Sequence, residues 1–230
     1  MLRLARLFLP LLACVAAPLA AQTGLAAEPA AAVEVSVASE EATAGSGRFV
    51  ASRPAALPRG IAAYGPFRVL DDGHAALVDV TDENSPAAFQ AMLTAYPGIH
   101  VLELVECPGT EEDRANLRLG RMIRTRGIDT HVPQGGSVRS GAVELFLAGV
   151  HHRAEPGAEF AVHAWADEDG HEPKDYPRDA PENRAYLDYY QQMGMTPAEA
   201  RAFYDMTNAV PNASARWMDS AQMGHWVRYN

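Results

Sequence analysis

Strand-like and helix-like segments alternate between residues 100 and 165, and this alternation constrains the fold more than any other feature. Strands are expected over 100–105, 128–132 and 159–165, with helices over 110–127 and 140–148 between them. Such alternation predicts an α/β domain with a largely parallel sheet, flanked by helices and linked by right-handed crossovers. In these sheets, sites form beyond the carboxyl ends of strands. The turns that follow strands are therefore the places to look for chemistry.

Further elements extend this domain on both sides. A hairpin is expected over 67–80 and a helix over 85–96, which Pro97-Gly98 ends. Two C-terminal helices are expected over 182–193 and 197–207. The second begins at Thr196-Pro197-Ala198-Glu199, which has the pattern of a capping box.

Two turns after predicted strands carry residues suited to acyl transfer. Ser140 follows a glycine-rich turn and opens an apolar helix, while His163 ends an apolar strand. A serine nucleophile needs an exposed hydroxyl and a nearby base, since the hydroxyl alone reacts weakly at neutral pH. It also needs N–H groups that bind an oxyanion, which Gly141 and the turn at Gly109 would supply.

The same segments resemble the ClpP/crotonase superfamily, and more narrowly the periplasmic ClpP-like proteins of Gram-negative bacteria. The resemblance covers roughly residues 64–223 and rests on four motifs. These are Cys107-Pro108-Gly109, Gly127-Ile128-Asp129-Thr130-His131-Val132-Pro133, the run from Ser140 to Leu145-Phe146-Leu147-Ala148-Gly149, and Ala161-Val162-His163. The spacing from serine to Ala-Gly fits Ser140 and does not fit Ser137.

The resemblance implies a serine hydrolase, most naturally a peptidase that acts on a peptide or protein through an acyl-enzyme. Ser140 would be the nucleophile, His163 the base, and Gly109 and Gly141, with Thr110 beside them, the oxyanion site. Asn212 is the candidate for the third member, holding the imidazole by accepting from its N–H. The resemblance also implies a homo-oligomer.

A non-catalytic protein that binds a peptide or an envelope partner in the same cleft is the alternative. Thr110 stands where relatives have a second glycine, Val138 and Ala142 replace two cysteines, and Ala161 replaces a glycine. These departures, and Arg139 beside the serine, favour the binding protein. An acyl-CoA enzyme is a third interpretation, disfavoured because export separates the chain from CoA and no basic phosphate site is visible.

The first 27 residues have the pattern of a signal peptide. Arg3 and Arg6 precede a short apolar stretch, and small residues offer cleavage sites. We expect residues 28–62 to form a flexible N-terminal segment and residues 63–230 the ClpP/crotonase-like domain, delivered to the periplasm. Cys14 weakly resembles a lipoprotein site. No segment is long enough to predict an integral membrane span.

Charge and composition exclude several classes of function. Without the leader, 17 basic side chains face 29 acidic ones, a formal charge of −12, which argues against nucleic acid as a partner. Lys174 is the only lysine, which disfavours a Ser-Lys dyad. No His, Asp and Glu spacing indicates a metal, so we expect no metal and no cofactor. Cys107 is expected to be a packed side chain.

Overall fold

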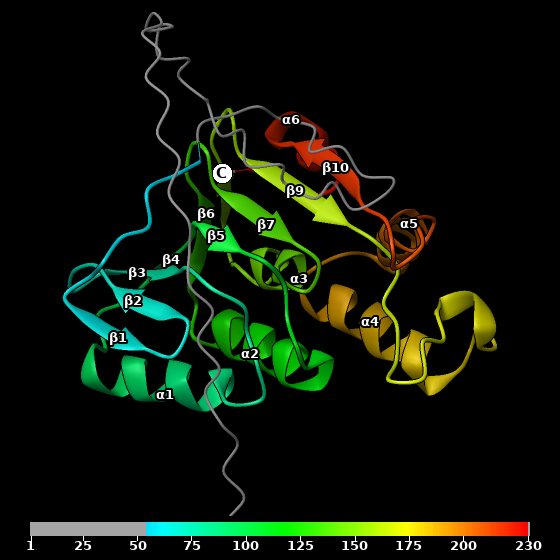
Figure 1. The fold of residues 1–230 in the computed structure, drawn as a ribbon, viewed down its shortest axis with the longest axis horizontal. Coiled ribbons are helices and arrows are strands. Elements are labelled where there is room, and N and C mark those ends of the chain that lie inside the picture. Colours follow the sequence, from blue (N-terminus) through cyan, green and yellow to red (C-terminus); the bar gives the residue numbers. More distant parts are fainter. Residues whose placement is uncertain (1–53, 230) are drawn as a thin grey trace, which may run out of the picture. The chain divides into compact units, whose positions relative to one another are not determined.

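A computed structural model describes residues 54–229, all of which belong to one compact unit (Figure 1). The predicted signal peptide, Cys14 and the part of the flexible segment before residue 54 lie outside the described residues. Among residues 54–229, no helix is long and apolar enough to cross a bilayer.

Six strands form the first sheet, in the order β1-β2-β3-β4-β6-β8. Their bounds are β1 (Ala62–Tyr64), β2 (Phe67–Val69), β3 (His74–Leu77), β4 (Val101–Leu104), β6 (Asp129–Val132) and β8 (His152–Ala154). The strands β1, β2 and β3 pair antiparallel, and β3, β4, β6 and β8 pair parallel. The predicted hairpin over 67–80 is confirmed as the β2–β3 pair.

Four strands form a second sheet, in the order β10-β9-β7-β5. These are β5 (Glu106–Cys107), β7 (Ser137–Arg139), β9 (Glu159–Val162) and β10 (Arg216–Asp219). The first three are parallel, and β10 pairs antiparallel with β9. The predicted α/β class, largely parallel and flanked by helices, is confirmed, although the sheet is divided in two.

The division arises because extended segments pass from one sheet to the other. At Val105, the N–H donates to the Leu77 carbonyl of the first sheet (3.0 Å), and the carbonyl accepts from Ser137 N of the second (2.9 Å). A tight turn at 133–136 separates β6 from β7, and Gly157 lies between β8 and β9. The carboxyl ends of β5, β7 and β9 therefore lie together, beyond the first sheet (Figure 1).

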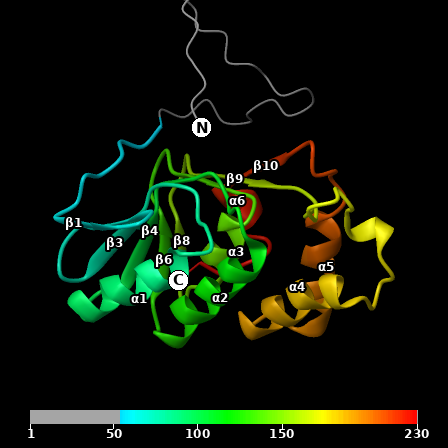
Figure 2. The ribbon, with the colours of Figure 1, turned by 60° about the horizontal axis from the view of Figure 1, so that its bottom comes forward.

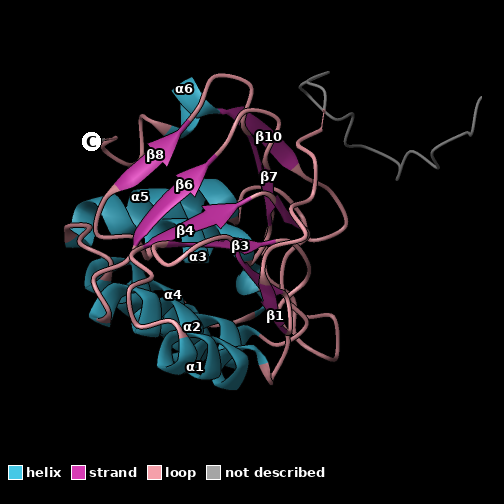
Figure 3. Ribbon diagram, turned by 90° about the vertical axis from the view of Figure 1, so that its left-hand side faces the viewer, coloured by secondary structure: helices cyan, strands magenta, loops and turns pink. Residues whose placement is uncertain are grey.

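Helices cover one face of the first sheet, as Figures 2 and 3 show. They are α1 (Ser85–Ala95), α2 (Asp113–Thr125) and α3 (Ala142–Leu147), each at or near its predicted position. Alternate strand residues point toward them: Leu102 and Leu104 of β4 and Val132 of β6 are buried. Most apolar side chains of both sheets and these helices form one core, and Ala76, Val78 and Val105 form a small second cluster.

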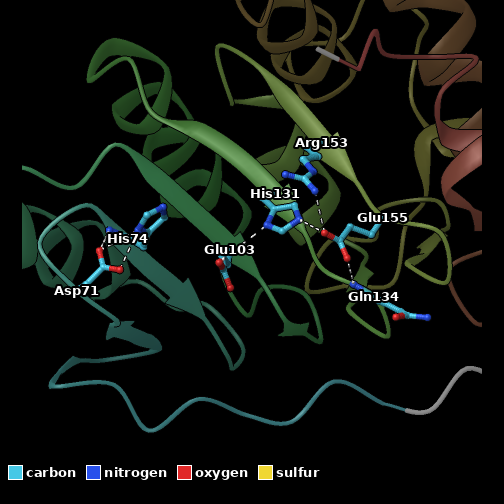
Figure 4. A network of polar contacts seen from close by, with 7 residues as sticks. All are labelled: Asp71, His74, Glu103, His131, Gln134, Arg153 and Glu155. Atoms are coloured by element: carbon cyan, nitrogen blue, oxygen red, sulfur yellow. Dashed lines mark hydrogen bonds and ion pairs between the residues drawn. The ribbon is translucent and has the colours of Figure 1, made fainter.

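The opposite face of the first sheet carries a polar network (Figure 4). Glu103, His131 and Arg153 are neighbours in register on β4, β6 and β8. The His131 ring lies between Glu103 (3.9 Å) and Glu155 (3.3 Å), and Arg153 also pairs with Glu155 (3.1 Å). This alternation of apolar and polar residues explains why only one face accepts helices.

The C-terminal helices are α4 (Pro181–Gln192) and α5 (Pro197–Thr207), preceded by a short 3-10 helix over Pro173–Asp175. Both helix predictions are confirmed, and Thr196 and Glu199 form the predicted capping box. A last short helix, α6 (Ser220–Met223), follows β10, a strand that the sequence pattern did not predict.

Gly120 on α2 allows α4 to dock. A Cβ at this position would lie 1.9 Å from the Tyr189 hydroxyl, which donates to the Glu144 carbonyl of α3 (2.6 Å). This contact holds α4 beside the start of α3, where the candidate site lies.

Candidate active site

Ser140 stands on a strained turn between a strand and a helix. It follows β7, precedes the α3 N-cap residue Gly141, and is the only non-glycine residue among 54–229 with a positive φ, 50°. Residues with a side chain rarely adopt this backbone conformation. It costs on the order of 1–3 kcal/mol and persists only where the surrounding structure imposes it. Here the Ser140 N–H donates to Ala161 O of β9 (2.8 Å), and its carbonyl accepts from Val143 N of α3 (2.9 Å). This is the backbone geometry of a nucleophile elbow.

The other serine and the arginine of this turn are occupied elsewhere. Ser137 is buried and donates to Glu159 (2.8 Å). Arg139 donates to the Ser137 hydroxyl (2.6 Å) and pairs with Glu106. Both side chains stabilise the second sheet, so Ser140 is the serine of this turn that remains available.

Gly109 lies directly beside Ser140. Its φ is 134°, which disfavours any residue with a side chain. A Cβ there would also come within 3.0 Å of the Ser140 Cβ and 3.4 Å of its Oγ. The glycine is therefore required by both conformation and space, and its backbone approaches the serine hydroxyl more closely than another residue would permit.

The N–H groups of Gly109 and Gly141 are unoccupied. Among the hydrogen bonds of the described residues, neither group has an acceptor. Each belongs to a turn next to Ser140, and Gly141 also begins α3. Unpaired N–H groups beside a serine hydroxyl are the donors that an oxyanion requires.

Two buried polar residues connect these turns, and the sequence interpretation missed both. Asn116 of α2 donates to Gly141 O (2.6 Å), and its Oδ1 accepts from the Thr81 hydroxyl (3.0 Å). The Thr81 N–H donates to Gly109 O (3.1 Å). The chain Gly141–Asn116–Thr81–Gly109 therefore ties the two turns together. A polar Asn116 on the apolar stripe with Leu119 and Ile123 was the available signal.

Thr110 braces its own turn and does not cap α2. Its hydroxyl lies 3.2 Å from Thr81 O and accepts from Glu112 N (3.2 Å). The helix cap is Glu112, whose carboxylate accepts from Arg114 N (3.1 Å) and Ala115 N (2.6 Å). The helix expected over 110–127 therefore begins only at Asp113, with Glu112 as its cap.

His163 follows β9, and its Nδ1 lies 2.8 Å from the Ala164 carbonyl. A hydrogen on Nδ1 satisfies this contact and leaves Nε2 as the basic nitrogen. Asn212 reaches the same place, with Nδ2 2.8 Å from Ala164 O and 3.3 Å from Nδ1. Of the two polar atoms of the Asn212 amide, only the nitrogen can donate to the Ala164 carbonyl. The amide nitrogen therefore lies on the side of the His163 ring, and the Asn212 oxygen does not face it. The sequence predicted that Asn212 accepts from the His163 N–H. In the structure the Ala164 carbonyl is the acceptor, and the Asn212 amide donates to that carbonyl.

Ser140 and His163 line one cavity of about 810 Å³, together with Thr110, Gly141 and Asn212. Its walls come from the start of α2, the Ser140 turn, the segment after β9, and α4. Among residues 54–229, no hydrogen bond joins the Ser140 hydroxyl to the His163 ring. Catalytic hydrogen bonds are often long without substrate, so the arrangement remains compatible with proton transfer.

The chain matches no family model and no curated protein. Some solved structures are similar to part of this chain. ClpP1 from Listeria monocytogenes has a TM-score of 0.49 and 13% identity, covering 68% of this chain and 88% of its own. The 1510-N membrane-bound stomatin-specific protease, solved as a mutant with a substrate peptide, has a TM-score of 0.42 and 12% identity, covering 65% of this chain and 71% of its own. Similarity at this level carries neither a site residue nor an activity to this chain.

Cys107 adds no chemistry to the site. Cys107 is fully buried, burial raises the pKa of its thiol, and the thiol contacts Leu77 O (3.5 Å). This is the packed cysteine that the sequence predicted. In the described part of the chain, no three His, Cys, Asp or Glu side chains are grouped as metal ligands would be.

Proposed function

We propose that this chain is an exported, ClpP-like serine hydrolase that cleaves peptides through an acyl-enzyme. The observation that carries the proposal is the positive φ of Ser140 at a strand-to-helix turn, which is the backbone conformation that exposes the hydroxyl of a nucleophile. Two further observations support it: the N–H groups of Gly109 and Gly141 next to Ser140 are unpaired, and His163 lines the same cavity as Ser140 and Gly141. Export rests on the leader pattern alone.

The proposed steps use the groups described above. His163 Nε2 takes the proton from Ser140 Oγ as that oxygen attacks the substrate carbonyl carbon. The N–H groups of Gly109 and Gly141 donate to the oxyanion. Nδ1–H stays bonded to Ala164 O, which stabilises the imidazolium. The ring then protonates the leaving amine, and water, deprotonated by the same nitrogen, releases the acyl group and restores Ser140.

A fluorophosphonate tests the chemistry directly. The purified protein should be labelled at Ser140, and Ser140→Ala should abolish labelling. Ser214→Ala is the matched control, since its hydroxyl makes no hydrogen bond with a described residue and lies outside the cavity lining. His163→Ala should slow labelling by about 10²–10⁴-fold, the usual contribution of a general base.

A well-folded protein that no fluorophosphonate labels across about pH 6–9 would contradict hydrolysis. The missing hydrogen bond between Ser140 and His163 would then favour the binding protein, with the same cavity as the peptide site. Two further expectations accompany the proposal: cleavage of the leader between Ala21 and Glu28, measured by mass spectrometry, and a homo-oligomer, measured by light scattering.

A further inference from the structure

The cavity beside Ser140 is lined by carboxylates. The lining contains one arginine, Arg114, and eight acidic residues, which are Glu111, Glu112, Asp113, Glu144, Asp167, Glu168, Asp169 and Glu182. Exposed acids at a rim are ordinary in a chain of this charge. Two of these acids, Glu144 and Asp113, are instead hydrogen-bonded to tyrosines of α4.

Glu144 is buried without a cation. It lies in the first turn of α3, four residues after Ser140, and is 7% exposed. Its Oε1 accepts from the Tyr190 hydroxyl (2.7 Å), and the backbone N–H of Glu144 itself also stabilises the carboxylate. No arginine or lysine of the described residues pairs with it. A buried carboxylate normally has such a partner, because an uncompensated charge is costly.

Asp113 has a similar arrangement at the start of α2, where it is half-buried. Its carboxylate accepts from the Tyr186 hydroxyl (2.7 Å). No arginine or lysine among residues 54–229 pairs with it, and His163 is the one basic side chain that acts on it electrostatically. Burial raises the pKa of both carboxyls, and the charge of Asp113 adds to the effect on Glu144. A positive charge placed between them would stabilise both carboxylates.

Aromatic rings complete the lining. Trp165, Tyr186 and Tyr190 all border the cavity. Trp165 stacks nearly parallel to Tyr186, at 5° and 6.2 Å between centroids, and its indole N–H donates to Tyr204 (3.0 Å). Fixed rings of this kind attract an ammonium or guanidinium group through the ring quadrupole. Carboxylates and aromatic faces together favour a cation on an apolar stem.

We propose that this cavity binds a lysine or arginine side chain of the peptide substrate, next to the carbonyl that Ser140 attacks. The stem would lie along the aromatic rings, and the charge would reach Glu144 and Asp113. The inference rests on the proposed hydrolase function, and it specifies which peptides that function selects.

Three peptidyl diphenyl phosphonates with one sequence test this selectivity. They carry lysine, norleucine or glutamate beside the phosphorus, so that lysine and norleucine differ only in the charged group. We expect lysine to label Ser140 roughly tenfold to a hundredfold faster than norleucine, the range for hydrogen bonds to charged groups, and glutamate to be slowest. Equal rates for lysine and norleucine would overturn the inference.

Variants identify the groups responsible. Glu144→Gln keeps the shape and the acceptor for Tyr190, and it should bring the lysine-to-norleucine ratio toward one. Asp113→Asn is a second variant, in case the first disturbs folding. Asp188→Asn removes one exposed carboxylate of α4 outside the cavity lining and should leave the ratio unchanged. A ratio that survives both cavity variants would contradict the assignment.

A small fluorophosphonate separates failure of this inference from failure of the proposed function. Labelling by that reagent without preference among the phosphonates would leave the hydrolase standing and exclude the cation site. If no reagent labels Ser140, Ser140→Ala is titrated with fluorescent lysine and norleucine peptides, followed by anisotropy. At least about tenfold tighter lysine binding would support the cation site, and equal binding would reject it.

Discussion

Replacement of Glu144 by glutamine should change how stability depends on pH. Burial raises the pKa of the Glu144 carboxyl from 4.5 to about 7, and the Tyr190 hydroxyl opposes that effect. One pH unit corresponds to about 1.4 kcal/mol, so the ionised side chain costs the folded state about 3 kcal/mol. Glu144→Gln removes the charge and retains an oxygen for the Tyr190 hydrogen bond.

The direction follows from where the protons are bound. Because the folded-state pKa is raised, the favourable contribution of protonated Glu144 is complete below pH 4.5 and is lost as pH rises through about 7. Relative to wild type, Glu144→Gln should therefore gain about 3 kcal/mol in unfolding free energy between about pH 4.5 and pH 8. Asp113, whose pKa is also raised by burial, and the Tyr189 and Tyr190 hydroxyls are present in both proteins.

Urea unfolding at several values from about pH 4.5 to pH 8 measures the difference. Asp188→Asn is the control, and its difference from wild type should be the same at every pH. The reasoning is refuted if the difference between Glu144→Gln and wild type is constant over that range. A gain in stability with a loss of lysine preference would mark Glu144 as a residue kept for function.

Three other substitutions or reactions test the site. Ser140→Gly should raise the unfolding free energy by about 1 kcal/mol over Ser140→Ala, because glycine accepts a positive φ; equal denaturant midpoints would contradict this. Gly109→Ala should lower the melting temperature and abolish fluorophosphonate labelling, since its Cβ meets Ser140 at 3.0 Å; unchanged labelling would exclude Gly109 from the oxyanion site. Cys107 should react with a thiol reagent only after unfolding, because its thiol is buried and its pKa is raised; rapid reaction of the folded protein would show that it is accessible.

Local patterns were sufficient for the longer elements, although not for short strands such as β10. Apolar periodicity and glycine or proline punctuation predicted the β2–β3 hairpin and all four long helices to within a few residues. The Thr196 capping box was readable because both of its partners lie within one turn. The placement of Ser140 after a strand also followed from local sequence, because a glycine-rich turn leading into an apolar helix is a local feature.

Contacts between distant segments decided the rest. Thr81 and Asn116 join the Gly109 and Gly141 turns from 35 residues apart, and no local pattern reports such a bond. The acceptor for His163 is likewise a backbone carbonyl, which carries no signature in the side-chain sequence.

The sequence by itself determined the alternation of strands and helices, the serine turn and the histidine at a strand end, since hydrophobic period and turn chemistry act over a few residues. Only the tertiary structure decided that the sheet divides at Val105, that Ser140 takes a positive φ, and that Glu144 is buried in the cavity. These properties depend on which surfaces meet. Burial and strain arise from packing between elements, which the order of residues along one element does not contain.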